Sequence, residues 1–275
     1  MTNTTDTYWD VDGVSLQTFA QNIETLGSRD VPPKYRGDDI TIPYMEGQLW
    51  VPKVPDSRII PLGMWVRGAN SDDSVDRDAR RIYDDNWRNL QRLLFTPGRQ
   101  FTLTKRFWYN GTLHTASAKA EFNDGLDPTM SGRTLSKFTV SLKLADPWFY
   151  ETTLQTVTLV NGDQNVTVAG DVPTRNIIAS INGVRTNPRI LNRTTGAQFT
   201  FAGSLLAGDT FSADVKAYRA TKTPSGGSAG KVNGSMIHSG DPQWLNLIPG
   251  VNVMNLSSDG TELGITQLQI RGAYL

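Results

Sequence analysis

Residues 101–111 read FTLTKRFWYNG, and this stretch carries the clearest structural signal in the chain. Phe101, Leu103 and the later odd positions alternate with the even ones, and a period of two is typical of a β-strand. Asn110-Gly111 supplies the positive φ angles of a type I′ turn. Residues 112–122 then return as a partner strand. We therefore predict a β-hairpin, in a sheet that is covered partly on both faces.

One long helix is predicted next to this hairpin, over about residues 74–95. Its apolar residues recur at spacings of three and four, which places them on one face: Val75, Ala79, Ile82, Tyr83, Trp87, Leu90, Leu93 and Leu94. Asp73 or Ser74 is the expected N-cap, and Thr96-Pro97-Gly98 ends the helix.

The other face of the predicted helix is charged, with Arg80, Arg81, Asp84, Asp85, Arg88 and Arg92. Two interpretations stay open for it. A solvated face with ion pairs four residues apart is the favoured one. An interaction surface is the alternative.

Composition changes near residue 150. Residues 1–150 hold 18 basic and 19 acidic residues, whereas residues 151–275 hold 9 and 8. Six of the seven Trp residues lie in the first part. We therefore predict two domains, 1–150 and 151–275, in a chain that is mainly β with one long helix.

The second domain reads as a series of short strands separated by turn residues. Eight strands are predicted: 157–160, 166–169, 177–181, 189–192, 198–202, 210–217, 251–256 and 263–271. Hairpin turns are expected at Asn161-Gly162, Asn182-Gly183, Asn233-Gly234 and Asp259-Gly260, and a flexible loop at 221–230. This pattern predicts an antiparallel β-sandwich of jelly-roll or galectin-like type.

Composition excludes several classes of function. Lys plus Arg and Asp plus Glu are both 27, so the net charge is zero, whereas nucleic-acid-binding proteins usually carry a basic excess. Cysteine is absent, which excludes disulfides, thiolate zinc sites and a cysteine nucleophile. No apolar stretch approaches the roughly 20 residues of a membrane span. We expect no membrane insertion and no export signal.

The search for catalytic motifs is negative. His114 and His238, the first on a predicted strand and the second in a loop, form no metal-binding or catalytic motif. Ser228 lies in a literal G-x-S-x-G match, but no helix follows it as a nucleophile elbow requires. The acidic doublets 38–39, 72–73 and 84–85 are typical of turns and caps. The sequence predicts no enzyme and no catalytic, cofactor-binding or metal site.

Two aromatic residues of the second domain are candidates for contact with a glycan. Trp244 could stack on a sugar ring, although a core position is the favoured interpretation for this amphipathic side chain. Tyr218 is the second candidate. A carbohydrate-binding or host-adhesion module is therefore the alternative function.

Several motifs recur in an order that carries a family resemblance. Residues 36–43 read RGDDITIP, residues 59–68 read IIPLGMWVRG, and residues 144–150 read LADPWFY. The second part contains NPRI at 187–190 and closes with WLNLIPGVN at 244–252. Over nearly the whole chain, this order resembles the distal tail proteins (Dit-like minor tail proteins) of long non-contractile-tailed bacteriophages, especially phages of actinobacteria.

The resemblance implies a fold and a structural role. Residues 1–150 would form a split-barrel belt domain with one helix, and residues 151–275 a galectin-like peripheral sandwich. The belt domains would assemble into a homohexameric ring at the distal end of the tail in the virion. That ring would join the major tail tube protein to the tail-tip or baseplate hub, and its lumen would pass the tape measure protein and DNA. The resemblance transfers no catalytic or contact residues.

Overall fold

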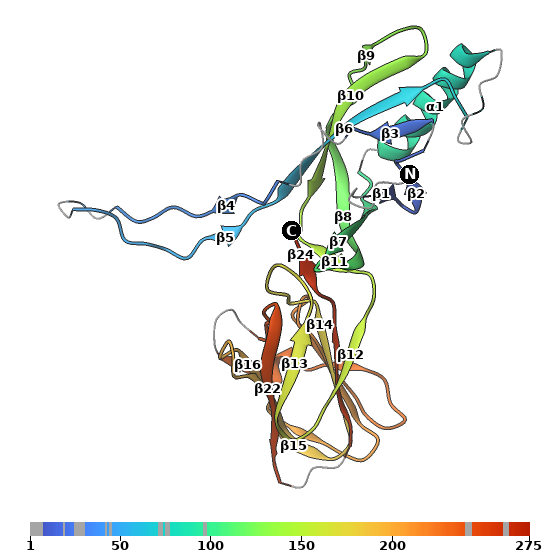
Figure 1. The fold of residues 1–275 in the computed structure, drawn as a ribbon. Coiled ribbons are helices and arrows are strands. Elements are labelled where there is room, and N and C mark those ends of the chain that lie inside the picture. The colour runs from blue at the N-terminus through green and yellow to red at the C-terminus, as the bar shows by residue number, and fades with distance from the viewer. Residues whose placement is uncertain are drawn as a thin grey trace. The chain divides into compact units, whose positions relative to one another are not determined.

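The computed structural model describes residues 8–18, 20–24, 31–41, 43, 46–70, 74, 78–95, 98–239, 244–260 and 264–275. They divide into two units, one of residues 1–149 with Leu275 and one of residues 150–274. Figure 1 shows both units. The fold class predicted from the sequence, mainly β with one α-helix, is confirmed over the described residues.

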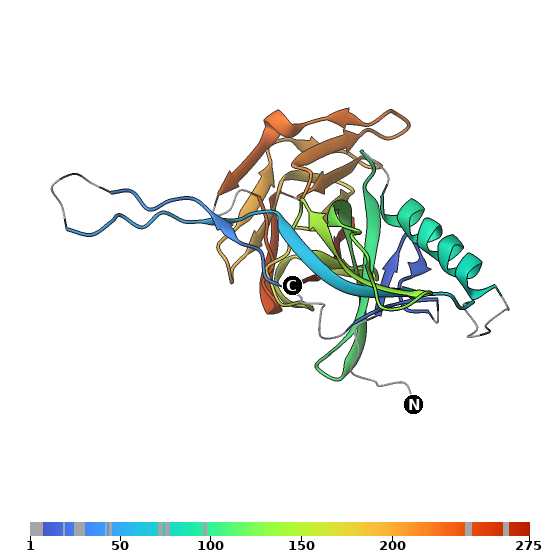
Figure 2. The same ribbon diagram turned by 90° about the horizontal axis from the view of Figure 1, so that it is seen from above.

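The sheet of unit 1 is antiparallel, with the strand order β2-β1-β7-β8-β10-β6-β3. Its strands are β1 (Tyr8–Val11), β2 (Val14–Ser15), β3 (Gln21–Ile23), β6 (Arg58–Arg67), β7 (Phe101–Tyr109), β8 (Thr112–Gly125) and β10 (Leu135–Leu144). The short β9 (Thr129–Met130) pairs with β10. The sheet curls into a half-barrel, and among the described residues β2 and β3 are the strands at its two ends (Figure 2).

The predicted hairpin at residues 101–122 is confirmed. β7 pairs with β8 from Phe101 opposite Ala120 to Tyr109 opposite Thr112. Asn110 and Gly111 form the turn, with φ angles of 48° and 77°. Phe101 and Leu103 are buried on one face, as the period of two requires. Lys105 on the same face is also buried, and its ammonium group lies over the rings of Phe107 and Phe149.

Helix α1 (Ala79–Leu94) packs on this sheet through the apolar face predicted for it, with Tyr83, Leu90 and Leu94 buried. The helix begins later than predicted. Asp78 is its N-cap, in place of Ser74 or Asp73, because the Asp78 carboxylate accepts the backbone N–H of Arg81. The predicted positions Asp73 and Val75 lie outside the described residues. Gly68 permits the close approach of β6, since a Cβ there would lie 2.0 Å from the Ala79 carbonyl oxygen.

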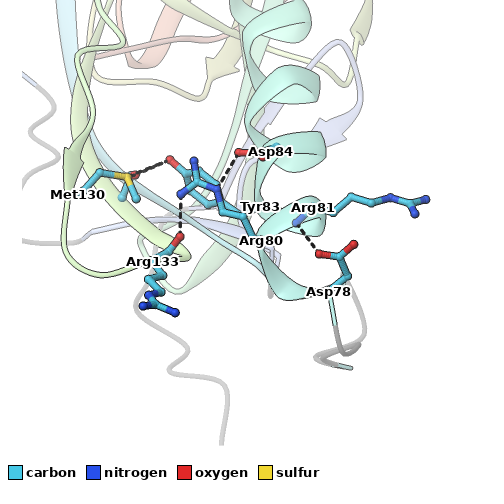
Figure 3. A network of polar contacts seen from close by, with 8 residues as sticks. Asp78, Arg80, Arg81, Tyr83, Asp84, Met130 and Arg133 are labelled. Atoms are coloured by element: carbon cyan, nitrogen blue, oxygen red, sulfur yellow. Dashed lines mark hydrogen bonds and ion pairs between the residues drawn. The ribbon is translucent and has the colours of Figure 1, made fainter.

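Polar contacts fix the first turns of α1 to β9 and to the connection between β9 and β10 (Figure 3). The Arg80 guanidinium donates to the Arg133 carbonyl oxygen at 2.9 Å and pairs with Asp84 at 3.3 Å. The Tyr83 hydroxyl reaches the Met130 sulfur. The ion pair four residues apart is the arrangement expected for a solvated helix face.

Unit 2 is an antiparallel β-sandwich. Its first sheet contains β12 (Gln155–Leu159), β14 (Ile177–Asn182), β18 (Thr210–Asp214), β19 (Arg219–Thr223), β20 (Gly230–Lys231) and β23 (Thr266–Ile270). Its second sheet contains β13 (Gly162–Val168), β15 (Arg185–Asn192), β16 (Gln198–Phe201), β17 (Ser204–Leu205), β21 (Met236–Ser239) and β22 (Gly250–Asp259). Two further strands, β11 (Phe149–Glu151) and β24 (Ala273–Tyr274), pair with each other. The galectin-like assignment remains a prediction.

Apolar side chains from both sheets fill the space between them. Phe199 and Phe201 from the second sheet pack against Phe211 from the first, with ring centroids 6.4 and 4.8 Å apart. All three rings are buried. This arrangement follows from the alternation of inward and outward residues along each strand.

Three predictions for unit 2 were wrong in part. Asn161-Gly162, Asn182-Gly183 and Asp259-Gly260 each fall between strands of different sheets, so none of them joins a hairpin. Asn233-Gly234 lies in a 3-10 helix, η1 (Asn233–Ser235). The predicted flexible loop 221–230 contains parts of β19 and β20, which pair with each other. His238, predicted in a loop, lies in β21.

Candidate functional site

The segment 31–57 of unit 1, which we call the arm, is a two-stranded ribbon between β3 and β6. β4 (Tyr35–Arg36) pairs with β5 (Val54–Pro55), and Ile40 exchanges both backbone hydrogen bonds with Leu49 at 2.9 and 2.8 Å. The ribbon extends away from the sheet of unit 1 in both views (Figures 1 and 2). Backbone hydrogen bonds therefore hold the arm together.

The described residues of the arm form no hydrophobic core. From Lys34 to Asp56 no described residue is buried. Large apolar side chains nevertheless lie along it, and several are more than half exposed: Tyr35 65%, Ile40 53%, Leu49 55% and Trp50 70%. A lone two-stranded ribbon is marginally stable in water. An exposed apolar surface of this kind is typical of a segment that is buried against a partner.

The outer part of the arm is acidic. Residues 37–52 contain Asp38, Asp39 and Glu46 and no Lys or Arg. The Asp39 carboxylate accepts the Val51 backbone N–H and pairs with Lys53 at 3.2 Å. These two contacts, the backbone hydrogen bond first, lower the pKa of Asp39. Asp38 and Glu46 are exposed.

A buried arginine fixes the base of the arm. Arg58, the first residue of β6, is 1% exposed. Its Nε donates to the Val31 carbonyl oxygen at 2.6 Å, and its guanidinium lies over the Phe149 ring. It also approaches the Pro147 carbonyl oxygen at 3.4 Å. The arm is therefore anchored where it leaves the sheet.

A hollow of about 470 Å³ lies between α1 and the end of β8, and we call it the helix groove. Its walls are Arg88, Gln91 and Arg92 from α1 and Phe122 from β8, with Phe95 and Leu126 beside them. The Phe95 and Phe122 rings meet edge to face at 5.4 Å. Phe95 is nevertheless more than half exposed. The groove thus combines aromatic surface with two arginines of α1.

A second hollow, of about 260 Å³, lies on the outward face of the second sheet of unit 2. Four cross-strand neighbours line it in a row, which we call the sandwich row: Ser257, Arg189, Thr200 and Ile237. Arg189 Nε donates to the Ser257 hydroxyl at 3.1 Å. Ile237 is exposed.

A β-bulge lies beside the sandwich row, next to Arg189 on β15. The register of β15 shifts between Thr186 and Arg189, and Asn187 there has a φ of 46°. The Asn187 amide donates to Asp259 at 3.0 Å and accepts the Gly203 backbone N–H. Bulges of this kind redirect side chains and are common beside binding sites.

The two aromatic residues predicted as glycan contacts lie together, but they are not equally accessible. Trp244 is 4% exposed and packs among Phe199, Tyr218 and His238. It lies in the core, the position that the sequence favoured. Tyr218 is 42% exposed, and its hydroxyl accepts a hydrogen bond from Arg175. A glycan contact at Trp244 stays a prediction, and the burial of its ring argues against it.

The described residues contain no group of three or more His, Asp or Glu side chains arranged to hold a metal ion. His114 lies on β8 and stacks on Phe107. Ser228 lies in an exposed loop, and the strand β20 follows it where a nucleophile elbow would need a helix. Asp84 and Asp85 lie on α1, and Asp72 and Asp73 lie outside the described residues. Among the described helices, none is long and apolar enough to cross a membrane.

Sequence reasoning missed the arm and the helix groove. The arm segment contains few residues in regular strands, so its alternation is too short to detect. Its available signal was the spacing of Pro43, Pro52 and Pro55 around apolar residues, which is typical of an edge ribbon. The residues that line the groove come from two segments about 30 positions apart in the sequence. A local sequence pattern cannot predict that such distant residues lie close together.

Comparisons with known proteins identify the fold. No protein-family model matches the sequence, and no curated protein matches it. Among solved structures, the crystal structure of the Dit protein of phage SPP1 is similar with a TM-score of 0.65 and 14% identity. The match covers 98% of this chain and 100% of that one. That protein is described as a paradigm of the hub adsorption apparatus in phages infecting Gram-positive bacteria.

Chains of the phage P2 baseplate in its activated conformation also match, with lower scores. The structure with Ca gives a TM-score of 0.45 at 8% identity, covering 98% of each chain. The structure with Sr gives 0.43 at 8%, covering 97% of this chain and 98% of that one. The match with the SPP1 Dit protein, which has the higher TM-score, shows that this chain has a similar fold.

Proposed function

We propose that this chain is a structural subunit of a bacteriophage tail tip. The observation that carries the proposal is the similarity to the SPP1 Dit protein over both units and nearly the whole of each chain. In this proposal unit 1 forms a belt in a homohexameric ring, and unit 2 lies at the periphery. The ring connects the tail tube protein to the hub, with a lumen for the tape measure protein and DNA.

The physical character of unit 1 supports a ring subunit. In the part of the chain that the structure describes, no strand pairs with the outer edges of β2 and β3, and unpaired strand edges promote association. Its arm carries apolar side chains without an interior of its own. Obligate interfaces bury about 2,000 Å² or more, and they are richer in apolar surface than transient ones. The proposed role is structural, with no reaction assigned.

The test is to locate the chain in intact particles. Cryo-electron microscopy of the phage that encodes it, combined with mass measurement of the purified protein, is expected to show six copies at the distal end of a long non-contractile tail. A chain that stays monomeric and is absent from tails would contradict the proposal. A phage host among the actinobacteria is part of the same proposal.

A carbohydrate-binding or host-adhesion role for unit 2 is a second candidate, and the sandwich row favours it. Sugars require neighbouring donors and acceptors beside apolar surface, and the row offers the Arg189 guanidinium, two hydroxyls and Ile237. We expect Arg189→Ala in the full chain to abolish binding on an array of host cell-wall glycans. Arg219→Ala, an exposed arginine of the other sheet, is the matched control. Loss on Tyr218→Ala alone would instead favour the aromatic pair predicted from sequence.

A further inference from the structure

The hollow on the outward face of unit 2 has a second line of side chains beside the sandwich row. Each of them lies two residues along the chain from a member of the row: Asp259, Asn187 and Ala202. Residues two apart on a strand share a face and lie about 7 Å from each other. The hollow of about 260 Å³ is slightly smaller than the roughly 300–1,000 Å³ of sites for drug-sized ligands, so its size suits one sugar residue.

One corner of the hollow holds a hydrogen-bond acceptor in a fixed position. Asp259 is the last residue of β22, and one of its carboxylate oxygens accepts the Asn187 amide at 3.0 Å. The Asn187 side chain is fixed in turn, because its oxygen accepts the Gly203 backbone N–H at 3.0 Å. The other carboxylate oxygen of Asp259 has no partner among the described residues. The bulge therefore orients an acceptor that remains available to a ligand.

A donor lies next to this acceptor. Arg189 Nε donates to the Ser257 hydroxyl at 3.1 Å, which orients the guanidinium group. In the part of the chain that the structure describes, the two terminal nitrogens of Arg189 have no partner. They carry N–H donors in a rigid plane and are available to a carbonyl oxygen. Arg189 is bonded at Ser257, and Asp259 lies two residues further along β22, so donor and acceptor occupy neighbouring corners of the hollow.

The apolar part of the hollow is aliphatic. Ala202 and Ile237 supply it, and Ile237 is 59% exposed. None of the described residues that line the hollow is aromatic. The hollow therefore lacks the flat ring on which the face of a sugar stacks. Its small aliphatic surface suits a methyl group, whose burial is favourable by itself.

An acetamido group combines the three features that this hollow requires. It has an N–H donor, a carbonyl acceptor and a methyl group, and its planar trans amide directs the N–H and the C=O to opposite sides.

The charge of the hollow also favours a neutral ligand. One guanidinium and one carboxylate line it, so their charges cancel. A sugar with a carboxylate would be repelled by Asp259, and a sugar with a free ammonium group would be repelled by Arg189. A neutral amide satisfies both side chains at once.

We propose that the hollow binds an N-acetylated hexosamine through its acetamido group. The free oxygen of Asp259 accepts the amide N–H, the Arg189 guanidinium donates to the carbonyl oxygen, and the methyl group lies on Ala202. The hydroxyls of Thr200 and Ser257 are left for the sugar ring. This inference rests on the carbohydrate-binding role proposed for unit 2 and names the class of sugar.

Calorimetric titration of the full chain with three matched tetrasaccharides tests the sugar class. Chitotetraose, its fully deacetylated form and cellotetraose share one backbone and differ at C2, where they carry an acetamido group, an ammonium group and a hydroxyl. We expect chitotetraose to bind at least tenfold more tightly than the other two. Without the acetamido group, Asp259 and Arg189 lose their water and gain no equivalent partner.

The outcomes separate this inference from the role on which it rests. Equal or tighter binding of cellotetraose or of the deacetylated form would overturn the sugar class and leave the carbohydrate-binding role intact. So would binding of other glycans on the array with none of chitotetraose. A chain that binds no glycan at all would contradict both.

Substitution of the acceptor assigns the contact. We expect Asp259→Ala to remove the preference for chitotetraose over cellotetraose, since the amide N–H then has no acceptor in the hollow. Asp171→Ala is the matched control, because Asp171 is an exposed carboxylate of unit 2 outside the hollow. An unchanged preference in Asp259→Ala, or an equal loss in both variants, would overturn the assignment.

A second variant tests the hollow without removing a polar group. Ala202 is exposed beside β16, so Ala202→Leu fills the apolar part of the hollow and leaves the core of the sandwich untouched. We expect it to weaken chitotetraose binding at least tenfold, with an unchanged circular dichroism spectrum. Unchanged binding would overturn the placement of the methyl group.

Discussion

The arm and the sandwich are both built from short antiparallel strands, but the sandwich alone encloses a core. In unit 2 the rings of Phe199, Phe201 and Phe211 are buried between two sheets. In the arm, Tyr35 and Trp50 lie on a single ribbon with water on both sides. The same strand chemistry thus gives one region with a hydrophobic core of its own and one whose apolar side chains stay exposed in the single copy.

The difference lies in how many layers each region has. A strand buries one face only when a second layer covers it. Unit 2 supplies that layer from its own sequence, through turns that carry the chain from one sheet to the other. The arm has no second layer, so its apolar residues contribute little to folding of the single copy. Substitutions in the two regions should therefore act on different equilibria.

The largest expected effect is on the core of unit 2. Phe211→Ala leaves a cavity beside Phe199 and Phe201, and truncation of a buried Phe costs about 3–5 kcal/mol. We expect a loss of that size in the free energy of unfolding, measured by urea denaturation followed by circular dichroism. A loss below about 1 kcal/mol would contradict a core of this packing density.

An intermediate effect is expected where the arm joins the sheet. Arg58→Ala removes the donor to the Val31 carbonyl oxygen and the cation over Phe149. Buried hydrogen bonds to a charged group contribute about 1.5–3 kcal/mol, so we expect unit 1 to lose about 3 kcal/mol. Arg36→Ala, an exposed residue of β4, is the control and should change the stability of the single copy little. Equal effects would show that Arg58 has no special role.

The arm and unit 2 should also differ in how strongly their stability depends on pH. In unit 2 Asp209 accepts the backbone N–H groups of Leu206 and Ser225 and pairs with Lys222 at 2.9 Å. The Leu206 hydrogen bond first, and then Lys222, lower the pKa of Asp209 below its ordinary value of 3.8. Its contribution to stability is therefore complete above that value and is lost as the pH falls through the lowered pKa.

We expect Asp209→Asn to flatten the acid side of the stability profile of unit 2, measured by urea denaturation between neutral pH and pH 3. Asp39 in the arm has a similar set of partners, and its pKa is lowered too. Because the arm adds no core, Asp39→Asn should leave the unfolding profile of the single copy unchanged. A matching change in both variants would contradict the distinction between arm and sandwich.

The smallest expected effect on the single copy is at Trp50. Surface substitutions outside special features change stability by no more than about 0.5 kcal/mol. We expect Trp50→Ala to remain within that limit in dilute protein, measured by the same denaturation. A loss comparable to that of Phe211→Ala would mean that the indole already has a partner within its own chain.

Local sequence patterns predicted the individual strands and turns of this fold better than they predicted which strands pair with each other. The alternation in residues 101–109 and the Asn110-Gly111 turn predicted the hairpin, because both its strands and its turn are contiguous. Asn182-Gly183 predicted a turn as well, but not that β15 joins the other sheet. A glycine with positive φ allows the next strand either to pair back on the same sheet or to cross to the other sheet. Packing between the two sheets determines which of these occurs.

The surfaces were harder to predict than the strands for the same reason. Trp244 could be placed in the core from its amphipathic character. The exposure of Trp50 could not be predicted from the sequence, since a Trp in a short apolar segment is usually buried in its own domain. The helix groove combines Arg88 and Arg92 with Phe122, and only the tertiary fold brings them together.

Hydrogen exchange of the arm tests most directly whether it gains its interior from another copy. The amides of Ile40 and Leu49 are paired across the ribbon but have no core to protect them. We expect them to exchange rapidly in the dilute single copy and at least about a hundredfold more slowly in assembled particles, by mass spectrometry. Equal exchange in the two states would contradict the account, because the arm would then remain in water after assembly.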